Sequence, residues 1–171
     1  MIHIRPATIV DAPVIALLGR TTFQETFGSL FRDQGDLRAY LNDTFSVKKI
    51  ERSLDKANNA FWLAFVDALP VGYAKLKLRS PTPFMVSTEV GQLQKIYVLH
   101  EFLSMKIGKR LQDILVEAAS LSGSNAVWLS VLKSNARAIR FYQKNEFNHV
   151  GAHQFVIGKE TFEFLVMAKQ F

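Results

Sequence analysis

The sequence contains no cysteine, which excludes disulfide bonds, thiolate metal sites and a cysteine nucleophile. It also lacks an apolar run of the roughly 18 residues that a membrane-spanning helix requires, and its first residues show no basic segment followed by an apolar one. Both absences favour a cytoplasmic protein with no membrane partner. The four histidines share no metal-ligand spacing, so we expect no metal site.

Acidic residues are the minority, because 15 Asp and Glu stand against 21 Lys and Arg, giving a formal net charge of +6. Such a balance favours anionic partners. The basic residues occur singly or in pairs, without the basic block or recognition motif of a nucleic-acid-binding protein, so we do not expect nucleic acid as a partner. With no linker and no shift in composition, residues 1–171 are predicted to form a single domain.

Hydrophobic periodicity predicts a mixture of strands and helices. A strand ends at Pro6, a helix starts from Thr8, two or three short helices fill 23–57, and strands at 60–67 and 70–79 form a hairpin. The remaining elements are a strand at 91–99, a helix over 104–121, a strand at 125–132, a helix from Ser134 or Asn135 to Lys144, and two strands within 147–169 turning at Gly158 and Lys159. This order predicts an α/β fold with a central mixed sheet and helices on both faces.

Only one glycine occurs in the predicted strand-turn-helix "YVLHEFLSMKIGKRLQ" (97–112), although phosphate-holding turns usually use several. If the helix begins near Ser104, the free amides of its first turn carry a partial positive charge, and Lys106, Lys109 and Arg110 add full charges. These features favour an anion site. A capped amphipathic helix with solvated lysines explains the same stretch.

The segment "VWLSVLKSNARAIRFYQKNEF" (127–147) presents a second candidate site. Asn135, Ala138 and Tyr142 recur at spacings of three and four, so an amide, a small side chain and a phenol face one side of a helix. Ala138 would permit a close approach, and Tyr142 could donate a proton. The alternative is a helix cap followed by a tyrosine that packs in the core.

Together these two segments resemble the GNAT superfamily of acetyl-CoA-dependent N-acetyltransferases. "LQKIYVLHEFLSMKIGKRLQDILVEAA" resembles its acetyl-CoA motif, and "WLSVLKSNARAIRFYQKNEF" resembles the next strand and its tyrosine-bearing helix. "TTFQETFG" and "GAHQFVIGKETFEFLVMAK" resemble the PaiA-type spermidine/spermine acetyltransferases. The resemblance implies a three-layer fold, with helices on both faces of a splayed, mixed sheet of about seven strands, and acetyl-CoA as cosubstrate without a metal.

The resemblance also implies a coenzyme site. Its residues would be Ile96, Tyr97, Val98, Ser104, Met105, Lys106, Ile107, Gly108, Lys109, Asn135, Ala138, Tyr142 and Lys144. The family pattern Q/R-x-x-G-x-G/A falls on Leu103, Lys106 and Gly108, so two of its three residues are absent, and Lys106 is expected to replace backbone freedom with a charge. Glu146 stands where the family has a glycine, and Asn145 is expected to make the left-handed exit from the helix instead.

The mechanism implied by the resemblance is direct attack of an amine on the acetyl thioester. Tyr142 would be the general acid, the Ile96 amide would stabilise the oxyanion, and Val98 would pair with the pantetheine. The substrate-binding candidates are Glu25, Glu89 and Gln94, and a cationic polyamine would add Asp33 and Asp36. PaiA-type relatives tend to carry an acid at the position of Gln94, so the general base stays open between water and Glu89.

The first functional hypothesis is therefore an N-acetyltransferase acting on a polyamine or another small amine. A protein or peptide N-acetyltransferase is an alternative, and so is a non-catalytic acetyl-CoA-binding regulator, which the glycine-poor turn and Gln94 would suit. The C-terminal strands leave open whether a homodimer forms.

Overall fold

The computed structural model describes residues 1–171 and contains seven strands and five α-helices. The strands are β1 (Ile2–Pro6), β2 (Asn59–Val66), β3 (Leu69–Lys77), β4 (Val90–Val98), β5 (Ala126–Leu132), β6 (Asn148–Ile157) and β7 (Glu160–Gln170). The α-helices are α1 (Ala12–Phe27), α2 (Gln34–Thr44), α3 (Val47–Leu54), α4 (Ile107–Leu121) and α5 (Ala136–Lys144), and 3-10 helices cover Ile9–Asp11, Gly28–Leu30 and His100–Met105. No helix is long and apolar enough to cross a membrane.

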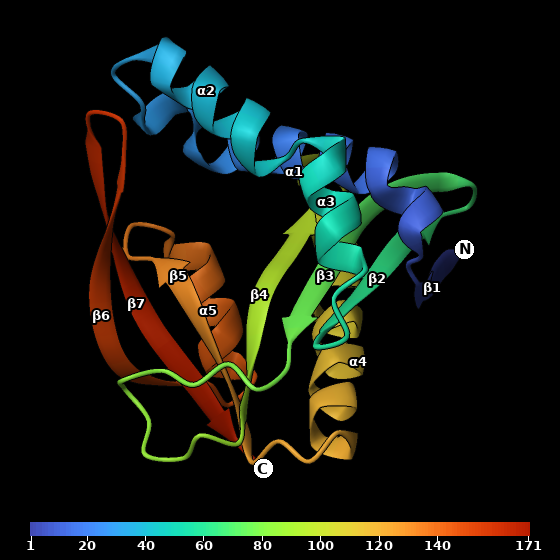
Figure 1. The fold of residues 1–171 in the computed structure, drawn as a ribbon, viewed down its shortest axis with the longest axis vertical. Helices are drawn as coiled ribbons and strands as arrows, with labels where there is room; N and C mark the ends of the chain where they lie inside the picture. The colour runs from blue at the N-terminus through green and yellow to red at the C-terminus, as the bar shows by residue number, and fades with distance from the viewer.

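All seven strands form one sheet in the order β1-β2-β3-β4-β5-β7-β6 (Figure 1). Every neighbouring pair is antiparallel except β4 and β5, which run parallel because α4 connects them. The predicted mixed sheet of about seven strands is therefore confirmed. The turn at Gly158 and Lys159 and the hairpin of β2 and β3 also form as predicted.

Helices cover both faces of the sheet (Figure 1). On one face, α4 buries Ile107, Leu111 and Leu115 in a core that also includes Ala74 and Leu129 of the sheet. On the other face, α1, α2 and α3 pack through two further apolar clusters, one of them rich in phenylalanine. These layers hold the middle strands from both sides and fix where their ends lie.

Strands β4 and β5 pair over only three positions, Val90–Gln92 with Ala126–Trp128. Beyond these pairs the two strands diverge, so that their carboxyl ends form the arms of a V (Figure 1). In addition, the register between β3 and β4 shifts so that Gln94 is an extra residue on β4, a bulge that increases the local twist. Beyond the three paired positions, the facing edges of β4 and β5 are therefore not paired with each other.

A compact ion pair fixes the start of the first helix. Asp11 accepts two hydrogen bonds of 2.8 Å from the Arg5 guanidinium and one of 2.8 Å from the backbone N–H of Thr8. The hydrogen bonds from Arg5 are the main reason that the pKa of Asp11 falls to about 2. Thr8 and Asp11 form the expected cap, although a 3-10 turn follows it and α1 begins only at Ala12.

The exit from α5 differs from the sequence-based prediction. Glu146 adopts the left-handed conformation, with φ 68°, whereas Asn145 has φ −101°. The prediction for Asn145 was wrong because the chain turns one residue later, where the N–H groups of Glu146 and Phe147 bond back to the last turn of α5. Glu146 is therefore left-handed at the position where the family pattern has a glycine.

We expect Glu146→Gly to raise the free energy of unfolding relative to Glu146→Ala by about 1 kcal/mol, because glycine has no Cβ to strain a left-handed residue. Both substitutions remove the exposed ion pair with Lys169, so their difference isolates the backbone conformation. Urea denaturation of the two variants measures it. Equal stabilities would show that Glu146 is not strained.

Candidate active site

The turn before α4 begins the helix later than the sequence predicted. The 3-10 helix His100–Met105 comes first, Lys106 is left-handed with φ 60°, and α4 starts at Ile107 rather than near Ser104. No side chain caps α4, and its first internal bond runs from the Arg110 N–H to the Lys106 carbonyl, 3.2 Å away. The earlier N–H groups of α4 thus have no partner within the helix, which gives this end a positive potential.

A cavity of about 710 Å³ opens at this turn. It lies between the turn, the carboxyl ends of the diverging strands, α1 and the start of α5. Its lining comprises Thr22, Glu25, Thr26, Leu30, Ile96, Tyr97, Val98, His100, Leu103, Ser104, Lys106, Gly108, Lys109, Leu132, Ser134, Asn135, Arg137, Ala138, Phe141 and Tyr142. Three segments far apart in the sequence, 22–30, 96–109 and 132–142, thus meet around one space.

The charges around this larger cavity are mainly positive. Lys106 and Arg137 have no ion-pair partner, whereas Lys109 pairs with Asp113 on the next turn of α4. The only carboxylate in the lining is Glu25, which accepts a hydrogen bond of 3.0 Å from the backbone N–H of His100. Two uncompensated cations beside a free helix N-terminus make the cavity suitable for an anionic ligand.

The exposed edge of β4 contributes backbone donors. The Leu99 N–H bonds to the Val71 carbonyl, 2.9 Å away, on the β3 side. Because successive N–H groups of a strand point to alternate sides, those of Ile96 and Val98 are directed toward the gap beside β5. Both residues line the larger cavity.

Helix α5 brings the predicted amide, small residue and phenol to the same cavity. Asn135 caps the helix, its side-chain oxygen accepting from the Ala138 N–H at 3.1 Å. Tyr142 packs edge-to-face against Phe147, with ring centroids 5.6 Å apart. Burial raises the pKa of the Tyr142 phenol well above its ordinary range, so the phenol keeps its proton at neutral pH and can act as a donor.

A smaller cavity of about 350 Å³ adjoins the larger one on the side of α1 and α2. Its lining comprises Phe23, Thr26, Phe27, Tyr40, Leu93, Gln94, Lys95, Ile96, Tyr97, Ser130, Val131, Leu132, Asn135, Ala138, Tyr142, His153, Phe155, Ile157 and Phe164. Thirteen of these residues are hydrophobic, and none is an aspartate or a glutamate. The cavity therefore suits an apolar or aromatic molecule better than a polycation.

The two cavities share seven lining residues, which shows that they meet. The shared residues are Thr26, Ile96, Tyr97, Leu132, Asn135, Ala138 and Tyr142. The residues at their junction include Tyr142 and Ile96.

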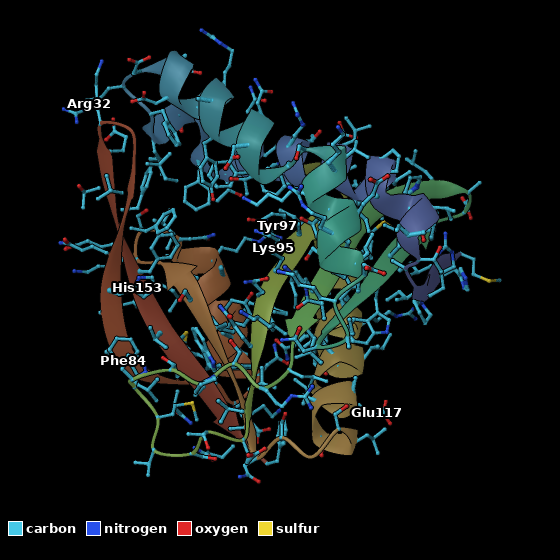
Figure 2. All side chains as sticks on the ribbon, in the orientation of Figure 1. Arg32, Phe84, Lys95, Tyr97, Glu117 and His153 are labelled. Carbon is cyan, nitrogen blue, oxygen red and sulfur yellow. The ribbon has the colours of Figure 1, made fainter.

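Among the polar residues that line the smaller cavity, Ser130 and His153 were not selected by the sequence analysis, whereas Gln94 was. His153 Nε2 is 2.8 Å from Ser130 Oγ, and the His153 ring stacks on Phe164 with centroids 5.4 Å apart. Gln94 Oε1 is buried without a hydrogen-bond partner. His153 on β6 and Lys95 on β4 lie on opposite sides of the gap between β4 and β5 (Figure 2).

The sequence matches that of the acetyltransferase (GNAT) family over residues 23–147, well over half of the chain. The chain belongs to this family. The prediction of an acetyltransferase is thereby confirmed, and family membership supports acetyl-CoA as the donor. No group of three or more histidine, aspartate or glutamate side chains is arranged to hold a metal ion.

Individual relatives agree with this assignment. The chain is 25% identical to an uncharacterized N-acetyltransferase in the pepI 3' region of Lactobacillus delbrueckii subsp. lactis over 150 residues, which are 88% of this chain and 86% of the relative. Among solved structures, the PaiA N-acetyltransferase of Thermoplasma acidophilum in complex with coenzyme A superimposes with a TM-score of 0.78 at 22% identity, over 100% of this chain and 99% of the other. NAA60 of Arabidopsis thaliana, in complex with a bisubstrate analogue, gives 0.77 at 16% identity over 99% and 98%.

Most predicted GNAT coenzyme residues line the larger cavity, but Met105, Ile107 and Lys144 line neither cavity. Ile107 is fully buried in the core, because the later start of α4 turns it inward, and Lys144 is exposed at the end of α5. Arg137 was missed, although a basic residue in the first turn of a helix beside a predicted ligand site was a usable signal.

The predicted substrate residues divide in the same way. Glu25 lines the larger cavity and Gln94 the smaller one, whereas Glu89 lines neither. Glu89 precedes the first residue of β4, and seven residues of extended strand place it roughly 20 Å from Ile96. Asp33 and Asp36 lie at the β6–β7 turn, where they bind the side chain and the backbone N–H of Lys159 at 2.8 and 2.9 Å.

We expect Lys106→Gly and Lys106→Ala to weaken coenzyme A binding to the GNAT site by about two- to fivefold each, the size of a solvent-exposed charge interaction. Isothermal titration calorimetry measures the two dissociation constants. The alanine variant is the control, since it removes the charge but keeps a side chain at the left-handed position. Tighter binding by the glycine variant would show instead that Lys106 hinders the coenzyme.

Proposed function

We propose that this chain acts as one domain, residues 1–171, that transfers the acetyl group of acetyl-CoA to the primary amine of a small molecule. The junction of the two cavities carries this proposal. The larger cavity has a free helix N-terminus, Lys106 and Arg137 for an anionic coenzyme, and the smaller one is mainly apolar and large enough for a small acceptor. Tyr142 borders both.

In this proposal the backbone amides at the start of α4 hold the coenzyme pyrophosphate, and Lys106 and Arg137 add charge. The Val98 N–H binds the pantetheine as an added strand would bind a sheet edge. The Ile96 N–H, directed into the same gap, stabilises the negative charge that develops on the thioester oxygen. Asn135 and Ala138 border the path between the cavities.

The reaction forms a bond between the amine nitrogen and the acetyl carbon and breaks the bond from that carbon to sulfur. Tyr142 donates its phenolic proton to the departing sulfur. Burial raises the pKa of Tyr142, so the phenol is protonated at neutral pH, which is the state that a proton donor requires. The amine must also lose a proton, for which Glu89 is too distant.

The acceptor is a small amine, since the smaller cavity measures about 350 Å³. The likeness to the PaiA N-acetyltransferase supports a polyamine, and Glu25 at the larger cavity could bind one ammonium. The absence of any carboxylate in the smaller cavity favours an amine with an apolar body instead. The likeness to the ribosomal-protein-S18-alanine N-acetyltransferase of Escherichia coli supports a protein or peptide amine as a further candidate.

We expect release of free thiol from acetyl-CoA with at least one amine from a panel of spermidine, arylalkylamines, amino acids and dipeptides. Tyr142→Phe should lower kcat by about 100-fold, within the range of general acid catalysis. Coenzyme A binding by calorimetry serves as the control for folding of the variant. A protein that binds coenzyme A yet acetylates none of these amines would instead be the non-catalytic regulator.

A further inference from the structure

Two lysines without counter-ions lie in the middle of the sheet, beside the smaller cavity, which is the proposed acceptor cavity. Lys75 on β3 and Lys95 on β4 are directly opposite each other in the sheet register. Like charges in this arrangement destabilise a sheet. Neither ammonium makes a hydrogen bond or an ion pair, and Lys95 lies over the rings of Phe45 and Tyr97, 5.1 and 5.3 Å from their centroids.

The surroundings of this pair add positive charge. Burial, followed by repulsion from Lys95 and other lysines, lowers the pKa of Lys75 to about 8, and burial also lowers the pKa of Lys95. The other lysines that act on Lys75 are Lys56, Lys77 and Lys49. Of these three, only Lys49 has a carboxylate nearby, Asp43 at 3.5 Å. Lys75 and Lys95 themselves therefore form a partly buried pair of like charges without a counter-ion, which is unusual in a protein.

Lys95 connects this region to the acceptor cavity, because it lines that cavity while Lys75 does not. We propose that the acceptor carries a carboxylate besides its amine, and that Lys95 binds this carboxylate. The charge of Lys75 adds to the positive electrostatic potential at Lys95. The acceptor is thus an amino acid, or an amine of similar size, with an apolar or aromatic body. This inference rests on the proposed acetyl transfer.

The lining of the cavity supports the rest of this description. Tyr40, Tyr97 and Phe164 contribute rings on which an aromatic body can pack, and no acidic side chain competes for Lys95. A charged hydrogen bond in such a place contributes about 10- to 100-fold in affinity. The carboxylate would supply the counter-charge that the protein itself does not.

The test compares acceptors in matched pairs: an aromatic amino acid with the arylalkylamine that lacks its carboxylate, and aliphatic pairs with longer spacing between amine and acid. We expect the wild type to favour the carboxylate-bearing member of at least one pair. The ratio of kcat/KM within that pair should fall about 10- to 100-fold in Lys95→Met, mainly through KM. Lys95→Arg, which keeps the charge, should retain more of the preference.

Two results would overturn this inference: a wild-type preference for the decarboxylated amine in every pair, or an equal ratio in wild type and Lys95→Met. In either case acetylation of the neutral amines would leave the proposed acetyl transfer intact. If no amine is acetylated, calorimetry with the same pairs and coenzyme A decides, and an absence of carboxylate-dependent binding also overturns the inference.

A second inference concerns the proton that the acceptor ammonium must lose. The Ser130 hydroxyl and the His153 imidazole are 2.8 Å apart, and both residues line the smaller cavity. His153 lies across the gap from Lys95 (Figure 2). We infer that the ammonium gives a proton to Ser130 Oγ as the Ser130 hydroxyl proton passes to His153 Nε2, leaving a neutral amine and an imidazolium. The Nε2 atom can accept this proton because it lies within hydrogen-bond distance of the hydroxyl.

Other titratable groups near His153 determine what a pH profile reports. Those that share its cavity are Lys95 of β4, Tyr40 of α2, Tyr97 of β4 and Tyr142 of α5, and Glu163 lies on the neighbouring strand β7, paired with Lys133. The three phenols have pKa values raised by burial, so they do not titrate near neutrality. If the pH profile of kcat/KM contains an ionisation near neutrality that the His153→Gln variant lacks, that ionisation depends on His153.

We expect His153→Gln to lower kcat/KM at neutral pH by about 100-fold for an alkylamine, and its activity to keep rising with pH as free amine accumulates. Ser130→Ala should show the same change of profile. His149→Gln is the matched control, a histidine on the same strand outside both cavities. If His153→Gln has the same pH profile as the wild type, the inference is overturned. If the wild type itself acetylates no amine, the proposed function is refuted instead.

Discussion

The short pairing between β4 and β5 is the constraint on which the site depends. Three paired positions hold the strands together at one end, and packing of α4 on one face and α1 on the other fixes the angle at which they separate. The divergence exposes the edge of β4 and leaves room for α5 to present Asn135 and Tyr142 at the gap. A longer ladder would close the sheet and remove both cavities.

Hydrophobic periodicity was enough to predict the order of the elements and the mixed sheet, because buried faces repeat every two or every three to four residues. It also predicted the shared face of Asn135, Ala138 and Tyr142, since residues at such spacings on one helix adjoin. It could not select Lys95 or His153. Those side chains are brought to one cavity by strands that are distant in the sequence. A local sequence pattern cannot predict which distant residues become neighbours.

The backbone conformations of individual residues could not be predicted from the sequence either. Lys106 and Glu146 both take left-handed conformations at positions where glycine is typical of the family. The surrounding packing therefore imposes the turn, at a cost of roughly 1–2 kcal/mol for each residue with a Cβ. At both positions the chain therefore has a left-handed residue without the glycine that usually permits one.

The open edge of β4 also has a consequence for association with other chains. Unpaired strand edges invite pairing with a foreign strand, and proteins usually protect them with charges, bulges or covering segments. Here the edge is recessed between α1 and α5, and Gln94 forms a bulge on it. A peptide strand with side chains on both faces would have to displace a helix, whereas a slender unbranched chain would not. The width of the gap therefore limits which chains could pair with this edge.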